Sequence, residues 1–243
     1  MPKSVELQYR QITRVSSKKN TTRPASLVVA TAHTEAGLRQ ARRLGSGAVG
    51  FVELRLDALA KNTGLVKRAL PGIKAPILIT ARHPAEGGLG RLSVASRRDL
   101  LAEFLLQADA VDVELRSATS LRGVLEEARG RGLTRVVSFH DFQRTPSLPR
   151  LREVVRRGVR AGADIVKIAT HLRGPNDLAA LLVLQGATKV PLATMGLGPL
   201  GKVSRLVLAA AGSRLNYGYL DKPQVAGQWP ALELARRLEE ILP

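Results

Sequence analysis

The chain alternates between two hydrophobic patterns from Ser26 onward. Short runs of apolar and β-branched residues, typical of strands, are each followed by a longer stretch in which apolar residues recur every three or four positions, typical of helices. The strand-like runs cover residues 26–32, 48–57, 76–82, 108–116, 134–140, 163–170, 190–195 and 213–219. Eight helical stretches alternate with them, the last from about Pro230 to Leu242. Eight such units predict a single-domain α/β protein with a (β/α)8 TIM-barrel fold over residues 26–243, whereas a doubly wound sheet usually has fewer strands.

Two of the predicted strands carry charges on alternate positions. Side chains alternate between the two faces of a strand, so the charged face of each points into the barrel when the apolar face packs against helices. Charged residues on these faces are Glu53, Arg55 and Asp57 in one strand and Asp112, Glu114 and Arg116 in the other. Buried charges are costly unless they are paired, so the pattern indicates either a polar site or an ion-pair network that stabilises the barrel.

Lys167 interrupts the apolar run ADIVKIAT and is expected near the carboxyl end of the sixth strand. Burial disfavours the ammonium form, which lowers the pKa of the amine and allows it to attack a carbonyl. His140 ends the fifth strand, and the two strand ends are neighbours in a barrel. The pair predicts an amine nucleophile beside a proton shuttle. A buried lysine paired with a strand carboxylate is the structural alternative.

Three further candidates lie at the end of the third predicted strand, in the loop after it, and at the start of the seventh predicted helix. Arg82 ends the third strand and is followed by Glu86, Gly87 and Gly88, a sequence typical of a mobile loop with an ionisable member. Arg205 begins the seventh helix, where a helix N-terminus and a guanidinium together suit a carboxylate. For each, a surface salt bridge is the alternative.

The composition restricts the chemistry. The absence of cysteine excludes disulfides, thiolate metal sites and a cysteine nucleophile, and fits a reducing compartment. A net charge of +18 raises nucleic acid as a partner, but basic residues are scattered and aromatics make up only 3%. Residues 1–25 are predicted to form a basic, flexible or loosely packed extension. With no membrane-length apolar run and no secretory signal, we expect a cytoplasmic protein that binds neither membrane nor nucleic acid.

In order and spacing, five motifs resemble those of the type I 3-dehydroquinate dehydratases, lyases of the shikimate pathway. They are ELRLD from Glu53, TARHPAEGG around Arg82 and Glu86, VSFHDFQRTP around His140, GADIVKIAT around Lys167, and the run from Met195 to Arg205. Any one of these would be weak evidence, but the resemblance covers nearly the whole barrel.

The resemblance implies the chemistry and the roles of the residues. Lys167 would form an imine with the C3 ketone of 3-dehydroquinate, and His140, oriented by Glu86, would be the general acid and base that yields 3-dehydroshikimate and water. Arg205 and Gln228 would bind the substrate carboxylate, to which Gln224 could still donate although it departs from the family pattern; Glu53, Arg55 and Arg82 would bind the ring hydroxyls; and Asp57, Asp112, Met195 and Tyr217 would shape the pocket. The resemblance implies no cofactor and no metal, and a homodimer.

The sequence departs from the family pattern at the loop that closes over the substrate. The family commonly has Ser-Ala-Pro-Gly-Gln there, and this chain has Gln224 to Gln228, with glutamine in place of serine. The longer side chain is expected to change how the loop seats and thereby the KM. Leu197 replaces a methionine of the pocket wall conservatively. Two other functions remain as alternatives: a class I Schiff-base aldolase on the same barrel, with a phosphate site in MGLGPLGKVSR, and a basic nucleic-acid-binding protein.

Overall fold

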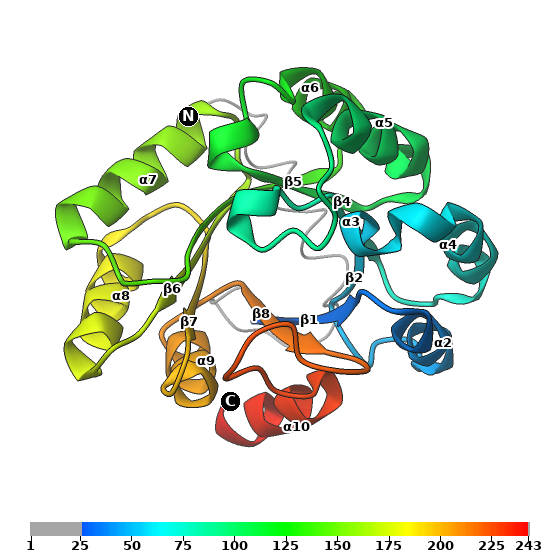
Figure 1. Cartoon of the computed structure of the whole chain (residues 1–243). Coiled ribbons are helices and arrows are strands. Elements are labelled where there is room, and N and C mark those ends of the chain that lie inside the picture. The colour runs from blue at the N-terminus through cyan, green and yellow to red at the C-terminus, as the bar shows by residue number, and fades with distance from the viewer. Residues whose placement is uncertain (1–25, 243) are drawn as a thin grey trace.

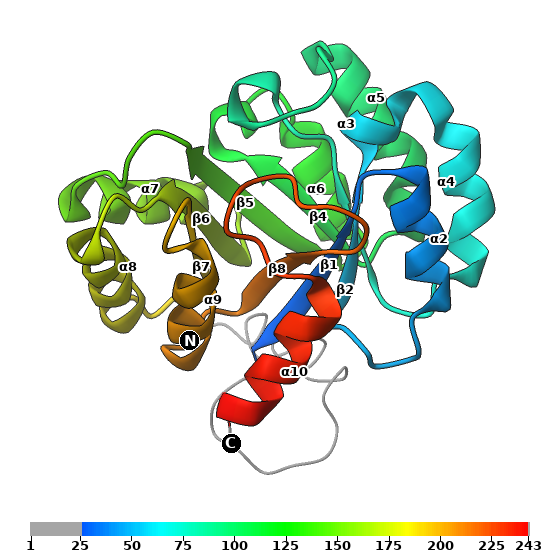
Figure 2. The same cartoon turned by 60° about the horizontal axis from the view of Figure 1, so that its bottom comes forward.

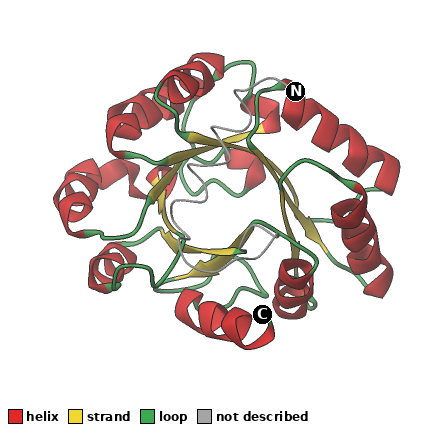
Figure 3. Cartoon of the chain, turned by 180° about the vertical axis from the view of Figure 1, so that it is seen from behind, coloured by secondary structure: helices red, strands yellow, loops and turns green. Residues whose placement is uncertain are grey.

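Eight parallel strands form the inner wall of the molecule in a computed structural model that describes residues 26–242 (Figure 1). The strands are β1 (Leu27–Ala32), β2 (Phe51–Arg55), β3 (Ile77–Thr80), β4 (Ala110–Glu114), β5 (Thr134–Asp141), β6 (Ile165–His171), β7 (Leu192–Leu197) and β8 (Leu215–Tyr219). Their order in the sheet is β7-β6-β5-β4-β3-β2-β1-β8. Seen from behind, the strands form a ring surrounded by helices (Figure 3). The predicted (β/α)8 barrel is confirmed.

The barrel closes at β7 and β8 through a small number of hydrogen bonds. The backbone nitrogen of Arg214 donates to the carbonyl oxygen of Leu192 at 2.8 Å. The buried hydroxyl of Ser213 accepts a hydrogen bond from the backbone nitrogen of Thr194 at 3.0 Å. A side-chain hydroxyl thus takes the place of part of a strand ladder where β7 and β8 meet.

At least one helix follows every strand, as the hydrophobic pattern predicts. The helices are α2 (Glu35–Arg43), α3 (Leu56–Leu59), α4 (Thr63–Ala69), α5 (Val94–Phe104), α6 (Arg122–Gly130), α7 (Leu148–Arg160), α8 (Pro175–Ala187), α9 (Gly201–Ala210) and α10 (Ala231–Ile241). Short 3-10 turns are η1 (Ala60–Asn62), η2 (Leu70–Gly72), η3 (Pro84–Glu86), η4 (Leu105–Gln107) and η5 (Leu115–Ser117). Capping fixes the start of α2, where the Thr34 side chain accepts from the backbone nitrogen of Gly37 at 2.9 Å.

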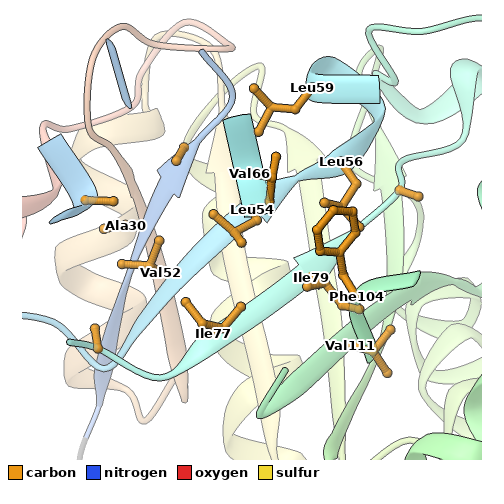
Figure 4. Packing of buried hydrophobic residues seen from close by; sticks show 14 of the residues in the cluster. Ala30, Val52, Leu54, Leu56, Leu59, Val66, Ile77, Ile79, Phe104 and Val111 are labelled. Atoms are coloured by element: carbon orange, nitrogen blue, oxygen red, sulfur yellow. The ribbon is translucent and has the colours of Figure 1, made fainter. Parts of the chain in front are cut away.

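The apolar core lies mainly between the strands and the helices. Outward-facing residues of β2 and β3, including Leu54 and Ile79, pack against α3, α4 and Phe104 of α5 (Figure 4). A smaller cluster, which includes Val29, Leu78 and Ala110, fills the barrel interior. The predicted division of β2 and β4 into an apolar face toward the helices and a charged face toward the interior is therefore confirmed for Val52, Leu54, Val111 and Val113.

The two charged strands end two residues earlier than predicted. β2 ends at Arg55, and Asp57 lies in α3, where its carboxylate accepts hydrogen bonds from the backbone nitrogens of Arg82 at 3.1 Å and Leu89 at 2.9 Å. β4 ends at Glu114, and Arg116 lies in η5 with 48% of its side chain exposed. Placing these two residues on inward strand faces was wrong, because the chain turns into a helix immediately after Arg55 and after Glu114.

The segment between β8 and α10 forms a long loop at the carboxyl end of the barrel (Figure 2).

Strand β6 extends to His171, so Lys167 is the third residue of the strand and lies further from its carboxyl end than predicted. The prediction for residues 1–25 lies outside the described residues. No helix within residues 26–242 combines the length and the apolar character needed to cross a membrane.

Candidate active site

A cavity of about 300 Å³ opens among the carboxyl-end loops and holds most of the predicted site residues. Its lining includes Glu53, Arg55, Arg82, Glu86, His140, Lys167, Met195, Arg205, Tyr217, Gln224 and Gln228. Strands β1, β2, β5, β6, β7 and β8, the loops after β3, β5 and β8, and helix α9 all contribute. Asp57 and Asp112 lie behind this lining and contact it through Arg55 and Arg82. The fold therefore brings together predicted site residues that are up to 175 positions apart, Glu53 and Gln228.

Lys167 is buried on the inner wall of the barrel, with 4% of its surface exposed. Its Nζ donates to Asp112 Oδ2 at 3.0 Å and lies 3.8 Å from the centroid of the Tyr217 ring. Burial lowers the pKa of Lys167, although the Asp112 carboxylate opposes this effect. The amine is therefore easier to deprotonate than an exposed lysine, while the ion pair and the ring fix its position.

Besides Lys167, two residues hold the Asp112 carboxylate with three hydrogen bonds. Arg82 forms a two-pronged pair with it, Nη1 to Oδ1 at 3.0 Å and Nη2 to Oδ2 at 2.8 Å, and the Ser138 hydroxyl donates to Oδ1 at 2.5 Å. Burial alone would raise the pKa of Asp112, but the Arg82 and Lys167 charges outweigh it and hold the pKa well below its usual range. Asp112 is therefore a permanent anion beneath the amine.

His140 and Glu86 form a second pair next to Lys167, on the neighbouring strand β5 and the turn after β3. Glu86 Oε2 lies 2.9 Å from the His140 Nδ1 and accepts a hydrogen bond from the His140 backbone nitrogen at 3.1 Å. Burial lowers the pKa of His140 well below its ordinary value, and the neighbouring Arg82 and Lys167 lower it further. Burial raises the pKa of Glu86 to about 7. The β5–β6 register pairs Ser138 with Lys167 and His140 with Ala169. His140 therefore lies two residues closer to the carboxyl ends of the strands than Lys167.

In two more carboxylates, both oxygens accept hydrogen bonds from neighbouring side chains. Glu53 accepts hydrogen bonds at 2.8 Å from the hydroxyls of both Thr31 and Thr80. Asp57 forms a two-pronged pair with Arg55, with both nitrogen–oxygen distances 2.9 Å. Burial raises the pKa of Asp57, but the hydrogen bonds and charge of Arg55 outweigh it, so the net pKa is lowered. Arg55 is thereby fixed at the cavity mouth.

Arg205 is a buried cation with an unusual set of partners. Its Nε donates to the carbonyl of Tyr217, and its Nη1 donates to the carbonyls of Gly196, Gly201 and Gly227, at distances from 2.7 to 3.0 Å. No carboxylate within residues 26–242 pairs with it, and its Nη2 makes no hydrogen bond there. Burial lowers the pKa of Arg205 to about 10. The residue is oriented rigidly and keeps an uncompensated positive charge at the cavity wall, which suits an anionic ligand.

The loop after β8 is tied to the barrel by its glutamines. Gln228 Oε1 accepts from the backbone nitrogen of Gln224 at 2.7 Å, which shapes the turn, and Gln224 Oε1 accepts from Arg55 Nη1 at 2.8 Å. The Gln224 Nε2 is buried without a hydrogen-bond partner among the described residues. Where the related pattern has serine, this chain therefore has a side chain that connects the loop to β2.

Sequence reasoning missed the residue that stabilises this site from behind. Arg97 of α5 is 1% exposed; its Nη2 pairs closely with Glu114 Oε2, and Glu114 Oε1 accepts from Arg82 at 3.0 Å. Arg97 shares the buried stripe of α5 with Leu101 and Phe104. An arginine at a core-facing helical position is the signal that could have revealed it.

Tyr217 was predicted to contribute apolar surface to the cavity wall, but it also brings a polar hydroxyl into the interior. Its ring lies against Lys167, but its hydroxyl is buried and makes no hydrogen bond to residues 26–242. Met195, 3% exposed, contributes apolar surface as expected. No group of three or more His, Asp or Glu residues within the described range could hold a metal ion.

Comparisons with known proteins agree with this arrangement. The model of the family described as type I 3-dehydroquinase matches residues 26–241. A 3-dehydroquinate dehydratase of Methanocella arvoryzae is 36% identical over 202 residues, which cover 83% of this chain and 90% of the relative. That of Methanothermobacter thermautotrophicus is 34% identical, covering 83% and 89% respectively.

Solved structures give the same result. The 3-dehydroquinate dehydratase of Geobacillus kaustophilus has a TM-score of 0.79 at 26% identity and covers 93% of this chain and 97% of its own. The type I enzyme of Clostridium difficile, solved with covalently modified comenic acid, has a TM-score of 0.79 at 25% identity, with coverages of 92% and 95%. On sequence and on structure alike, this chain belongs to the type I 3-dehydroquinase family.

Proposed function

We propose that this chain dehydrates 3-dehydroquinate to 3-dehydroshikimate, the shikimate-pathway reaction, through an imine on Lys167. The observation that carries the proposal is the buried Lys167 amine, its pKa lowered by burial, in one cavity with His140 and the uncompensated cation Arg205. The named function of the relatives supports the same substrate and reaction.

The steps follow from the groups present. The neutral Lys167 amine attacks the C3 ketone, and loss of water gives an imine whose nitrogen withdraws electrons from C2. His140 Nε2 takes the C2 proton, the C1–oxygen bond breaks, and the departing hydroxyl receives a proton from His140. Water then hydrolyses the imine and releases the lysine. The net change is the loss of one water from the substrate.

We assign the remaining residues by charge and position. Arg205 would bind the substrate carboxylate, with Gln228 and Gln224 closing the loop beside it. Glu53, Arg55 and Arg82 would contact the ring hydroxyls from β2 and β3. Asp112 would hold Lys167 in place, Asp57 would orient Arg55, and Met195 and Tyr217 would enclose the ring. In this mechanism every step uses a side chain of the cavity.

The aldolase alternative has less support. A sugar-phosphate site in MGLGPLGKVSR would need free backbone amides. The backbone nitrogen of Gly201 donates to the Gly198 carbonyl at 2.9 Å, and that of Gly198 faces the Ala226 carbonyl at 3.4 Å. The carbonyls of Gly196 and Gly201 point to Arg205 instead. Several exposed arginines pair with a nearby acid, as Arg39 does with Glu35 and Arg131 with Glu127, which fits a solvated surface better than a nucleic-acid interface.

We also propose that the protein is a homodimer, which the family resemblance implies, and that it is cytoplasmic. Val183 on α8 and Val203 and Val207 on α9 are exposed apolar residues on packed neighbouring helices, and they support an association face there. The lack of cysteine fits a reducing compartment.

Borohydride trapping tests the proposed function. The protein is incubated with 3-dehydroquinate, reduced, and digested for peptide mass mapping. The expected result is a stable adduct on Lys167 and, in unreduced samples, growth of the enone absorbance of 3-dehydroshikimate. Absence of both would contradict the proposed reaction, and an adduct formed only with sugar phosphates would favour the aldolase.

Substitution of Arg205 tests the carboxylate contact. We expect Arg205→Lys to raise the KM by about 10-fold, because lysine keeps the charge but lacks the two-pronged guanidinium. We expect Arg205→Met to raise it by about 100-fold, because the charge itself is lost, and we expect smaller effects on kcat in both variants. Steady-state kinetics measure both parameters, and circular dichroism checks folding, since the four carbonyls also lose their donor. An unchanged KM in a folded Arg205→Met protein would contradict the assignment.

A further inference from the structure

One ionic contact reaches the His140–Glu86 pair from outside the cavity. Glu86 Oε2 faces His140, and the other carboxylate oxygen, Oε1, faces Arg116 Nε at 3.5 Å. Glu86 is 6% exposed in its side chain, and Arg116 of η5 is 48% exposed. The carboxylate therefore connects a solvent-exposed cation to the buried imidazole.

The other charged groups around Glu86 are already paired with one another. Arg82, at the end of β3, lies in a fork on Asp112 and also donates to Glu114. Glu114 of β4 is further paired with Arg97, and His140 approaches from β5. Arg116 pairs with no carboxylate other than Glu86 within the described part of the chain. It is therefore the one cation facing Glu86 whose charge no other carboxylate offsets.

The state of Glu86 decides which imidazole nitrogen carries the proton. An ionised Glu86 accepts from Nδ1–H of a neutral imidazole and leaves Nε2 with a free lone pair. A protonated Glu86 donates to Nδ1 instead, so the ring proton moves to Nε2, and that nitrogen can no longer act as a base. Burial alone favours the protonated carboxyl, since it raises the pKa of Glu86, whereas the charges of Arg82 and, to a smaller extent, of Arg116 lower it.

We propose that Arg116 is a positioning residue of the reaction: through Glu86 it keeps the His140 proton on Nδ1 and leaves Nε2 free to take a proton from the substrate. The proposal rests on the proposed function for the identity of the substrate. Arg116 itself contacts neither His140 nor the proposed reacting atoms in this arrangement. Its effect is on the charge state of the carboxylate.

The pH dependence of kcat/KM tests the proposal. Protonation of the pair removes the base, so activity falls below a pH near the Glu86 pKa of about 7. In Arg116→Met this acid limb is expected to move upward by about half a pH unit, a modest shift because an exposed pair is screened by water. At one unit below the limb this is about a 3-fold loss of kcat/KM, which disappears at alkaline pH. Arg116→Lys is expected to restore most of the wild-type profile.

A matched control separates this local effect from a general change in charge. Arg129→Met removes the same charge from an exposed position in α6, where the side chain forms no ion pair with Glu86 or His140, and it is expected to leave the profile unchanged. Superposed Arg116→Met and wild-type profiles would overturn the proposal. So would an equal shift in Arg129→Met, or a loss in Arg116→Met that is the same at every pH.

A second readout does not depend on turnover. Ring ¹⁵N chemical shifts of His140 in the free protein, assigned with His140→Asn, report which nitrogen carries the proton. Over the pH range of the acid limb, the wild type is expected to keep Nδ1–H to lower pH than Arg116→Met, and identical titrations would overturn the proposal. If the wild type did not convert 3-dehydroquinate, the proposed function would fail while this titration still decided the role of Arg116.

Discussion

Replacing Lys167 with alanine is expected to lower the turnover of 3-dehydroquinate by at least about 10⁴-fold and to abolish borohydride trapping. No other amine can take its place in the cavity, since Lys167 is the only buried lysine among residues 26–242. The protein is expected to stay folded, because Asp112 keeps its fork with Arg82 and its hydrogen bond from Ser138. Turnover is followed by the enone absorbance, and trapping by mass spectrometry.

The charge-conserving variant Lys167→Arg separates nucleophilic attack from electrostatics. A guanidinium preserves a positive charge beside Asp112, but it stays protonated and does not form the imine. Equal loss in both variants is the result expected of a covalent mechanism. If Lys167→Arg retained substantial turnover, the lysine would act through its charge alone, and the imine mechanism would be wrong.

The proximity of Lys167 and His140 could be predicted from the sequence because it depends on backbone topology. Strands that are consecutive in a parallel barrel lie side by side, and residues near their carboxyl ends meet at one face. The register of Ser138 with Lys167 places His140 two residues further along that wall. Alternation likewise placed Glu53 and Asp112 inside, because their neighbours Val52 and Val111 are apolar.

The partners of these residues could not be predicted in the same way. The cage of carbonyls around Arg205 depends on loop conformations, among them the left-handed glycines Gly198 and Gly227, with φ of 80° each. The bond between Arg55 and Gln224 joins residues 169 positions apart. Asp57 and Arg116 were misplaced because nothing in the alternating pattern shows that the strand has ended. Long side chains then find partners that only the folded geometry defines.

Arg97→Met is expected to lower the free energy of unfolding by about 3–5 kcal/mol, because it leaves one oxygen of a buried carboxylate without its cation. Glu114 is fully buried, and Arg97 also donates to the carbonyl of Ala81 at 2.7 Å and to the Ser117 hydroxyl at 3.1 Å. The methionine fills part of the volume but satisfies none of these acceptors. Chemical denaturation measures the change.

The neighbouring Arg98→Met provides the control for this prediction. Arg98 lies on the same helix and pairs with Asp99, but both side chains are more than half exposed, so its removal is expected to change the stability by less than about 0.5 kcal/mol. Adding Glu114→Gln to Arg97→Met is expected to recover part of the loss, since the unpaired charge is then gone. If Arg97→Met were as stable as Arg98→Met, the pair with Glu114 would contribute nothing. If the double variant were no more stable than Arg97→Met alone, the cost would come from Ala81, Ser117 and packing.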